Sequence, residues 1–410
     1  MKTRPILYIL FLLASLQSLA QSESQDFPTY ARTQDSLMMD AYYSKDVKKY
    51  HATLEQFMIR YNALSKEEQA IYSPSLYNAY YNLACTYSLL NDKENGLKYF
   101  KKAVDAGYLE YQHIKQDTDL DILRNEPGFI EIMKMLKSIG DYQFILQNAQ
   151  AYRTDEYYDM PEFRYMSFED ENLVELRSAF NLDSIAGKGT QQFQAINLMH
   201  WIHYLIPHDG QHDNPVLKNA MSMIAECKKD NRGLNCRGLA TVLNECYLSM
   251  GFKSRMVTCY PKDSLGIDPD CHVINTVWID ELNKWIWLDP TNDAYVMDEK
   301  GVLQSIQEVR EKISNGSTLI LNPEANWNRI STTIDYYIYQ YMAKNLYMLE
   351  CPVVSQYNME TREDGRIFKY VKLIPEDYFK VLPPVSEEQN QAKTNTWIIY
   401  NIYNPAEFWK

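Results

Sequence analysis

The sequence contains no cluster of basic residues, although charged side chains are common in it. It has 41 Lys and Arg against 54 Asp and Glu, which gives a net charge of −13. Proteins that bind nucleic acid depend on concentrated Lys and Arg to contact the phosphates. The charge pattern therefore argues against nucleic acid as a partner, and an acidic surface mainly favours solubility.

Long apolar segments are also missing beyond the N-terminus. With 46% hydrophobic and 23% charged residues, the composition is that of a folded globular protein. A membrane-spanning helix needs roughly 20 consecutive apolar residues, and no segment after the N-terminus has them. We therefore expect no stable insertion into a membrane.

The cysteines lack the spacing of a zinc site or of a disulfide-dense scaffold, since the sequence has seven of them and no CxxC pair. An odd number leaves at least one free thiol in an exported protein. Cys85 and Cys246 lie in apolar helical patterns and are expected to be small core residues. Cys271 is expected to pack beneath a strand, with a disulfide to Cys259 as the alternative.

The N-terminal segment has the pattern of a secretory signal peptide. Lys2 and Arg4 precede an apolar run over residues 6–14, and Ser18-Leu19-Ala20 supplies small residues before a cleavage point. We expect residues 1–20 to be removed by cleavage after Ala20, which predicts a secreted or periplasmic protein. No cysteine lies near this point, so a lipid anchor is not expected.

Residues 21–140 read as helical, and one stretch within them is a helix pair. Small residues at Ala84 and Gly96 would let two helices approach closely, and Tyr87 and Phe100 would fill the space beside them. This stretch resembles a tetratricopeptide repeat. Only one repeat is clear and solenoids need about three. We therefore expect a packing scaffold, with a groove for a peptide or protein partner as the alternative.

The 410 residues exceed what a single hydrophobic core usually holds, so we expect further domains. Residues 141–345 are predicted to form the domain that carries the chemistry, and residues 346–410 a β-rich extension that completes or flanks it. Residues 367–374 and 396–403 have the β-branched and aromatic content of strands. The polar residues 386–395 between them read as a loop.

The segment from Asn231 to Gly251 reads as a polar loop that runs into a helix. Apolar residues recur with helical spacing after Cys236, so this cysteine is predicted at or just before the helix N-terminus. The helix dipole and the free amides there stabilise an anion, which lowers the pKa of a thiol. The N–H of Cys236 could also donate to an oxyanion. Residues 254–260 then read as a strand.

A β-hairpin is predicted next, with His272 opening its first strand and Asp289 ending its second. If the turn centres on residues 280–281, the two residues lie directly opposite each other. If it centres on residues 282–283, Asp289 faces Thr276 instead. Both registers keep the two side chains at the same end and on the same face of the hairpin.

The order of these features resembles the core of the transglutaminase-like superfamily: Cys236 opens a helix, His272 opens a strand, and Asp289 ends the next strand before Pro290. The resemblance is strongest over residues 230–292. It implies an α+β fold in which a papain-like, transglutaminase-like domain follows the tetratricopeptide-like helical domain. It also implies a triad of nucleophile (Cys236), acid and base (His272) and orienting carboxylate (Asp289).

The implied activity is that of an exported cysteine-dependent acyl-transfer enzyme with no cofactor or metal. The simplest reaction is hydrolysis of a peptide or other amide bond through a thioester of Cys236, as in a cysteine peptidase or amidase. Transfer to a lysine amine would make the protein a cross-linking transglutaminase. A catalytically inert secreted protein that binds or assembles polypeptides on the same fold is the other alternative.

Three histidines close in sequence, His203, His208 and His212, precede this segment. No matching pair of carboxylates or thiolates accompanies them, and Gly210 marks a loop, so a metal site is not expected.

A side-chain donor to the oxyanion is not identifiable in the sequence upstream of Cys236. Asn231 and Asn235 are candidates for this role, and shaping of the loop before the helix is the alternative for both.

Overall fold

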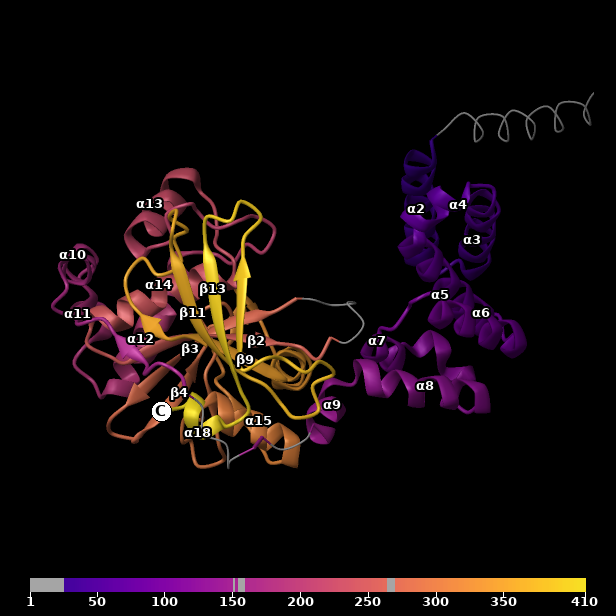
Figure 1. Ribbon diagram of the computed structural model, residues 1–410. Helices are drawn as coiled ribbons and strands as arrows, with labels where there is room; N and C mark the ends of the chain where they lie inside the picture. The colour runs from indigo at the N-terminus through magenta and orange to yellow at the C-terminus, as the bar shows by residue number, and fades with distance from the viewer. Residues whose placement is uncertain (1–25, 150–151, 154–158, 264–269) are drawn as a thin grey trace, which may run out of the picture. The chain divides into compact units, whose positions relative to one another are not determined.

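The computed structural model describes residues 26–149, 152–153, 159–263 and 270–410. The chain divides into two compact units between Asp141 and Tyr142 (Figure 1). The predicted signal peptide, residues 1–20, lies outside the described residues. Among the residues that are described, no helix is both long and apolar enough to cross a membrane.

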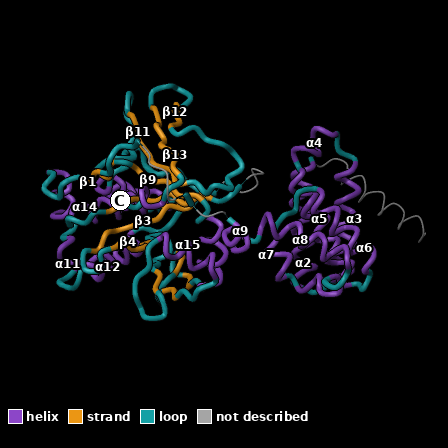
Figure 2. The backbone as a smooth tube through the Cα atoms, turned by 60° about the horizontal axis from the view of Figure 1, so that its bottom comes forward, coloured by secondary structure: helices purple, strands orange, loops and turns teal. Residues whose placement is uncertain are grey.

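The first unit is helical, as the sequence predicts (Figure 2). Its elements are α2 (Phe27–Tyr43), α3 (Val47–Asn62), α4 (Lys66–Ile71), α5 (Ser73–Leu89), α6 (Lys93–Asp105), α7 (Tyr111–Gln116), the short 3₁₀ helix η1 (Thr118–Leu123) and α8 (Pro127–Gly140).

Helices α5 and α6 pack closely because small residues lie between them. A Cβ at Gly96 would stand 3.6 Å from the carbonyl oxygen of Ala84 and 3.2 Å from the side chain of Leu123. Phe100 is fully buried and stacks on Phe129 with ring centroids 4.8 Å apart. The packing is that of a helical pair, and its tetratricopeptide-like character stays a prediction.

The second unit is built on a seven-stranded sheet. In spatial order its strands are β12 (Val385–Gln389), β13 (Thr396–Ile402), β11 (Ile367–Leu373), β9 (Met348–Pro352), β2 (Ser254–Tyr260), β3 (His272–Ile279) and β4 (Lys284–Leu288). Strands β11 and β13 are parallel, and every other neighbouring pair is antiparallel.

Helices and short strand pairs surround this sheet. The helices are α9 (Tyr142–Asn148), α10 (Glu171–Ala179), α11 (Leu182–Ala186), α12 (Gln191–Leu205), α13 (Ala220–Asp230), α14 (Cys236–Ser249), α15 (Ile306–Asn315), α16 (Ile334–Tyr336), the π-helix η2 (Tyr337–Met342), α17 (Ala343–Asn345) and α18 (Pro405–Phe408). The short pairs are β1 (Arg164–Tyr165) with β10 (Val354–Ser355), β5 (Val296–Met297) with β6 (Ile320–Leu321), and β7 (Asn326–Trp327) with β8 (Ile330–Ser331).

The two faces of the sheet are covered by different helices because successive side chains of a strand point to opposite faces. Val277 and Ile286 join the core that contains α12 and α14. Ile274 and Trp287 join the core on the other side, with residues of α15 and η2. Helix α14 packs on β2 and β3, and it is buried along nearly its whole length.

The strands predicted at residues 367–374 and 396–403 are present as β11 and β13, and they extend the sheet that contains β2, β3 and β4. The prediction of a loop over residues 386–395 was wrong for its first part, because β12 runs over Val385–Gln389. This strand lies at the edge of the sheet and most of its side chains are exposed. It therefore lacks the alternating apolar pattern that marks a half-buried strand in sequence.

Candidate active site

Cys236 is the first residue of α14, as predicted, and the loop before it is held by asparagines. The Asn235 side chain caps the helix by accepting from the N–H of Gly238 at 3.1 Å. Asn214 donates to this same oxygen at 2.7 Å and accepts from the N–H of Asn235 at 3.0 Å. A Cβ at position 238 would stand 2.6 Å from the oxygen of Asn214, so this close packing requires glycine.

Both asparagines proposed as oxyanion donors shape the loop, as the alternative interpretation predicts. The side-chain oxygen of Asn235 is used in the cap, and Asn231 ends α13 in the left-handed region with a φ of 48°. Donation from their side-chain amides to an oxyanion stays a prediction.

The imidazole of His272 lies against the carboxylate of Asp289, and both side chains are buried. His272 Nε2 is 2.8 Å from Asp289 Oδ2. The same carboxylate oxygen accepts from the hydroxyl of Tyr337 at 2.7 Å and from the side-chain amide of Asn292 at 3.0 Å. The other oxygen accepts from the N–H of Thr291 at 2.8 Å. The carboxylate is therefore fixed in one orientation relative to the imidazole.

The register of the hairpin lies midway between the two predicted alternatives. Trp278 pairs with Trp285 and Asn275 pairs with Leu288, so the turn centres on residues 281–282. The residue that continues this register opposite Asp289 is Ile274. Because strand side chains alternate with a period of two, this register still keeps His272 and Asp289 on one face.

Charge separation stabilises this pair. Burial alone would raise the pKa of Asp289, but the positive charge and hydrogen bond of His272 lower it below its usual value. Burial alone would lower the pKa of His272, but the charge and hydrogen bond of Asp289, together with Cys236, raise it to about 10. His272 is therefore an imidazolium at neutral pH.

The thiol of Cys236 is partly exposed, and hydrogen-bond donors surround it. Burial alone would raise its pKa, but hydrogen bonds from the His208 and His272 side chains and from the N–H of Val273 lower its pKa to about 6. The positive charge of His272 acts in the same direction. A thiolate beside an imidazolium is the reactive pair of a cysteine nucleophile.

His208 is the site residue that the sequence interpretation missed. Its Nδ1 lies 3.1 Å from Nε1 of Trp327, and an indole nitrogen can only donate. Nδ1 of His208 therefore accepts, which leaves Nε2–H as the donor toward the thiol. The backbone N–H of His208 donates to Asn328 at 2.8 Å, and its carbonyl accepts from the same side chain at 2.9 Å.

The histidine motif did not predict this role because its three members separate in the fold. His203 bonds the carbonyl of Pro290 and the side chain of Asn326. His212 is exposed and bonds Asp209 at 2.7 Å. Of these three histidines, His208 is the one that bonds the thiol. A backbone bridge between His208 and Leu234 joins its loop to the segment before Cys236.

The π-helix η2 supplies two tyrosines to the site. Tyr337 donates to Asp289, and the hydroxyl of Tyr341 lies 3.1 Å from Nδ1 of His272. Insertions of this kind in helices are frequent at functional sites because they redirect side chains. Here two tyrosines four positions apart contact the two members of the His272–Asp289 pair.

A hollow of about 310 Å³ is lined by His208, which bonds the thiol of Cys236, and by Tyr341, which lies beside His272. Thr291 and Asn292, which follow the triad carboxylate, also line it, and Trp327 and Ile330 supply apolar walls. The hollow is of the size that small ligand groups occupy.

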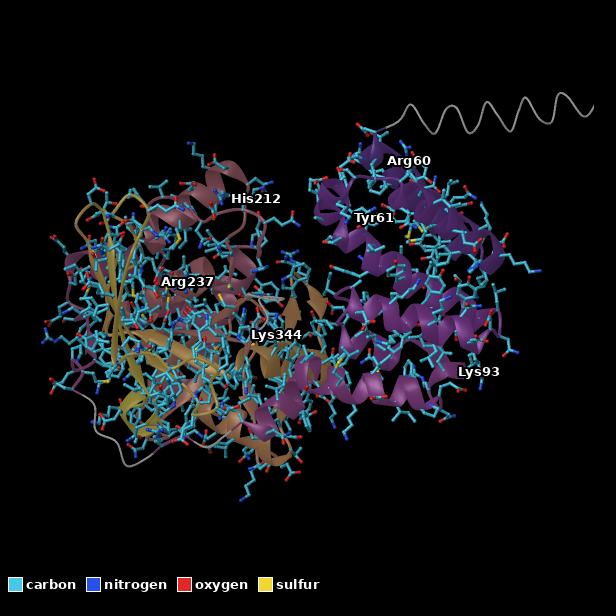
Figure 3. The ribbon with its side chains drawn as sticks, turned by 45° about the vertical axis from the view of Figure 1, so that its right-hand side comes forward. Arg60, Tyr61, Lys93, His212, Arg237 and Lys344 are labelled. Carbon is cyan, nitrogen blue, oxygen red and sulfur yellow. The ribbon has the colours of Figure 1, made fainter. Side chains whose placement is uncertain are left out.

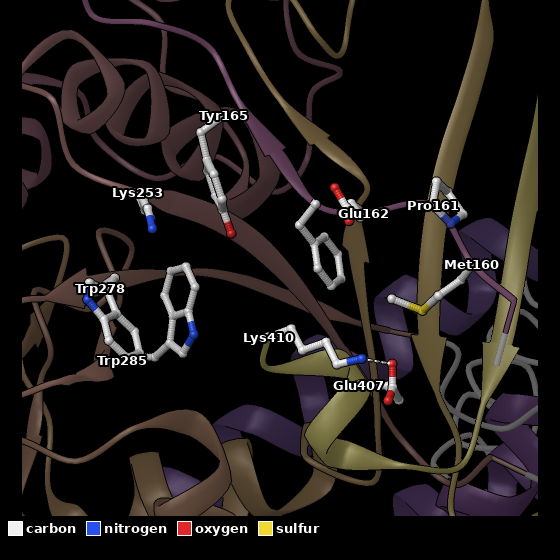
Figure 4. A pocket seen from close by; sticks show the side chains of 10 residues that line it. Met160, Pro161, Glu162, Tyr165, Lys253, Trp278, Trp285, Glu407 and Lys410 are labelled. Atoms are coloured by element: carbon white, nitrogen blue, oxygen red, sulfur yellow. Dashed lines mark hydrogen bonds and ion pairs between the residues drawn. The ribbon is translucent and has the colours of Figure 1, made fainter. Parts of the chain in front are cut away.

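A second hollow, of about 490 Å³, is lined by different residues (Figure 4). Tyr165, Trp278 and Trp285 surround it, and Lys410 forms an ion pair with Glu407 at its edge. Cys236, His272 and Asp289 are not among its lining residues, so this hollow is not part of the candidate site.

A group of potential metal ligands lies in the helical unit. Cys85, Asp117 and Asp119 have ligand atoms within 4.8 Å of one another. The Cys85 thiol donates to Asp117 at 3.5 Å, and the hydroxyl of Tyr81 donates to the same oxygen at 2.7 Å. Burial and the charge of Asp117 raise the pKa of Cys85 well above its usual value. A protonated thiol bonded to a carboxylate accounts for this group without an ion.

A comparison with known protein families matches part of the second unit. The family described as "Transglutaminase-like superfamily" matches residues 179–290, a segment that contains Cys236, His272 and Asp289. The chain therefore has a helical region followed by a transglutaminase-like domain, and its fold class is α+β, as predicted.

Two individual proteins are similar to parts of the chain. A chloroplastic protein of Arabidopsis thaliana is 33% identical over 101 residues, which are 25% of this chain and 27% of that protein. The chain thus matches only about a quarter of that relative's length. A solved structure described as a putative cysteine protease from Cytophaga hutchinsonii is 14% identical, covers 39% of this chain and 57% of that one, and has a TM-score of 0.23.

Proposed function

We propose that the protein is a cysteine-dependent hydrolase that cleaves an amide bond of a peptide or protein through a thioester of Cys236. The observation that carries this proposal is the arrangement around the thiol. Cys236 opens a helix and accepts hydrogen bonds from two imidazoles and a backbone amide, and one of these imidazoles, His208, lines a hollow. A core cysteine has no such set of donors, and the other described cysteines are buried or have a raised pKa.

The first half of the reaction forms the thioester. The Cys236 thiolate attacks the carbonyl carbon of the amide, and the carbonyl oxygen becomes an oxyanion. In this proposal two donors stabilise this oxygen: the N–H of Cys236, which has no acceptor within its helix, and Nε2–H of His208, which turns from the sulfur to the oxyanion as the thiolate charge is lost. The C–N bond then breaks as the His272 imidazolium gives its proton to the leaving amine.

The second half returns the enzyme to its starting state. His272, now neutral, takes a proton from water, and the resulting hydroxide attacks the thioester carbon. The oxyanion collapses, the C–S bond breaks, and the carboxylic acid leaves while the Cys236 thiolate is restored beside the imidazolium. Asp289 keeps the imidazole oriented throughout and stabilises its positive form.

We also propose that this chemistry takes place outside the cytoplasm, on the support of the signal-peptide pattern over residues 1–20. A polypeptide substrate and, at the helical region, a protein partner belong to the same proposal. Water is the simpler acceptor of the acyl group, and a lysine amine is the alternative acceptor.

The thiol can be tested directly because the chain contains its own control. Cys236 and Cys271 are both partly exposed, but burial and the nearby Cys236 raise the pKa of Cys271 above its usual value. At pH 6.5, iodoacetamide should therefore modify Cys236 at least about tenfold faster than Cys271, as measured by mass spectrometry of tryptic peptides. The rate at Cys236 should rise with a midpoint near pH 6.

Equal rates at the two cysteines would overturn the proposal of an activated nucleophile. If the thiol is activated, peptide pools should be cleaved by the protein and not by its Cys236→Ser variant. Incorporation of a fluorescent primary amine into protein, in place of cleavage, would assign transfer rather than hydrolysis.

A further inference from the structure

A charged hollow of about 430 Å³ is lined by Arg237, the neighbour of Cys236 in sequence, and by residues of the C-terminal strands. Helix α14 packs on β2 and β3, and the hollow opens over the neighbouring strands β9, β11 and β13 on the same face of the sheet. Arg237, the residue that follows Cys236, lines it (labelled in Figure 3). Cys271, which precedes the catalytic histidine, interacts electrostatically with both Cys236 and Arg237. The hollow is therefore lined by the direct sequence neighbour of Cys236.

The buried carboxylates of this hollow already have cationic partners. Glu360 pairs with Arg237 at 3.3 Å, and Glu350 pairs with Lys372 at 2.9 Å. Glu388 lies on the edge strand β12 and is exposed to solvent. The buried wall is thus close to neutral, and any excess of charge must come from the remaining groups.

Two remaining groups are cations, Lys218 and Arg362. Neither the amine of Lys218 nor the guanidinium of Arg362 forms an ion pair with a carboxylate among the residues that the structure describes. The backbone N–H of Lys218 donates to Thr361 at 2.7 Å, which holds the two cations at the same rim. Burial and the positive charge of Arg362 lower the pKa of Lys218 below its usual value. An anion between the two side chains would relieve this repulsion.

An aromatic platform lies beside these cations. Phe368 and Trp397 stack with ring centroids 5.1 Å apart and an interplanar angle of 13°. The guanidinium of Arg362 lies over the Trp397 ring at 5.5 Å, which limits the directions in which it can point. The hollow therefore offers cationic donors on one side and a flat apolar surface for carbon atoms on the other.

We propose that this hollow is a substrate subsite that binds a carboxylate of the polypeptide between Lys218 and Arg362. The inference rests on the proposed function, because carboxylates are the common anions of an unmodified polypeptide substrate. A residue spans at most about 3.6 Å of extended chain, so this carboxylate would lie within a few residues of the amide at Cys236. It would come either from an Asp or Glu side chain or from the C-terminus of the substrate.

The test uses the mature chain with Cys236→Ala, so that binding is measured without turnover. Mixtures of N-acetylated pentapeptides with randomised flanking positions are prepared in matched forms. One arm compares a central Glu with Gln, and the other compares a C-terminal carboxylate with a carboxamide. Retention on the immobilised protein is quantified by mass spectrometry. In one arm, the carboxylate form should be retained about tenfold better than its neutral match, because hydrogen bonds to a charged group are stronger than those to a neutral one. The arm that shows this preference identifies whether the carboxylate comes from a side chain or from the C-terminus.

Two variants locate the effect. The double variant Lys218→Gln/Arg362→Gln should abolish the preference, so that the carboxylate and neutral forms are retained equally. Lys369→Gln, an exposed lysine on β11 that does not line the hollow, should leave it unchanged. Equal retention of the matched forms in both arms, or a preference that survives the double variant, would overturn the inference.

Alkylation of Cys236 in the native-cysteine protein separates this inference from the proposed function. An activated thiol without a carboxylate preference would refute the subsite and leave the hydrolase proposal intact. A carboxylate preference without an activated thiol would refute the hydrolase and leave a carboxylate-binding hollow.

Discussion

Two histidines approach the same thiol from different parts of the chain, and their partners give them different charges. His272 lies at the start of β3 and bonds the carboxylate of Asp289, which favours its positive form. His208 lies in the loop before α13 and accepts from the indole N–H of Trp327, which requires a bare ring nitrogen. In the proposed mechanism, this difference gives His272 the proton transfer and gives His208 the role of a neutral donor.

The two hollows lined by His208 and by Arg237 also differ from each other. The hollow beside His208 has aromatic and apolar walls, whereas the hollow beside Arg237 is lined by charged residues from the C-terminal strands. These strands extend the sheet far beyond the hairpin that carries the triad. In our proposals, the first hollow admits the acyl group and the second selects the substrate.

Removal of His272 is expected to have the largest effect. In His272→Ala, Cys236 loses its positively charged neighbour, so its pKa should rise from about 6. Alkylation at pH 6.5 should slow on the order of tenfold, because the loss of thiolate outweighs its greater nucleophilicity. Amide hydrolysis should fall by at least about 10³, since general acid and base catalysis is lost. An unchanged alkylation rate in His272→Ala would show that His272 does not activate Cys236.

Substitution of His208 should slow hydrolysis much more than alkylation of Cys236. In His208→Ala, hydrolysis should fall by about 10² because an oxyanion donor is lost, while alkylation, which forms no oxyanion, should slow only a few-fold. His208→Gln keeps a side-chain N–H and should recover part of the hydrolysis rate.

His212→Gln is the matched control for this pair, since His212 is exposed and contacts Asp209 rather than the thiol. It should behave like the unmodified protein in both assays. If His208→Ala slowed alkylation and hydrolysis equally, the two histidines would have the same role and the comparison would fail.

The smallest effect is expected for Trp327→Phe. This change keeps an aromatic wall but removes the N–H that donates to Nδ1 of His208, so the ring can take either tautomer. Hydrolysis should fall by about threefold to tenfold, in line with loss of a hydrogen bond worth about 1 kcal/mol. Thermal unfolding should change little, because the side chain is 44% exposed. A loss as large as that of His208→Ala would mean that Trp327 contacts the substrate itself.

Local sequence patterns predicted the elements that carry the triad. A polar loop followed by helical spacing located the start of α14 at Cys236, and the strand at residues 254–260 was placed correctly. Alternation along the hairpin put His272 and Asp289 on one face in either register, and the actual register shares that parity. These inferences succeeded because helix starts and strand faces depend on residues close together in sequence.

The partners that set the chemistry could not be found in this way. His208 reaches Cys236 through a bridge to Leu234, and Tyr337 reaches Asp289 from a π-helix 48 positions away. The edge strand β12 and the pairing of the C-terminal strands with β2 through β9 were equally hidden, because long-range pairing leaves little local signal.

The sequence by itself determined the helix that opens with Cys236, the hairpin that bears His272 and Asp289, and therefore the chemistry that the site can attempt. Only the tertiary structure decided which of three neighbouring histidines faces the thiol, how the hairpin is registered, and which charged groups line the second hollow. The physical reason is that backbone preferences and side-chain periodicity act locally. The pKa of a thiol and the charge of an imidazole are set by whatever the fold brings within hydrogen-bond distance.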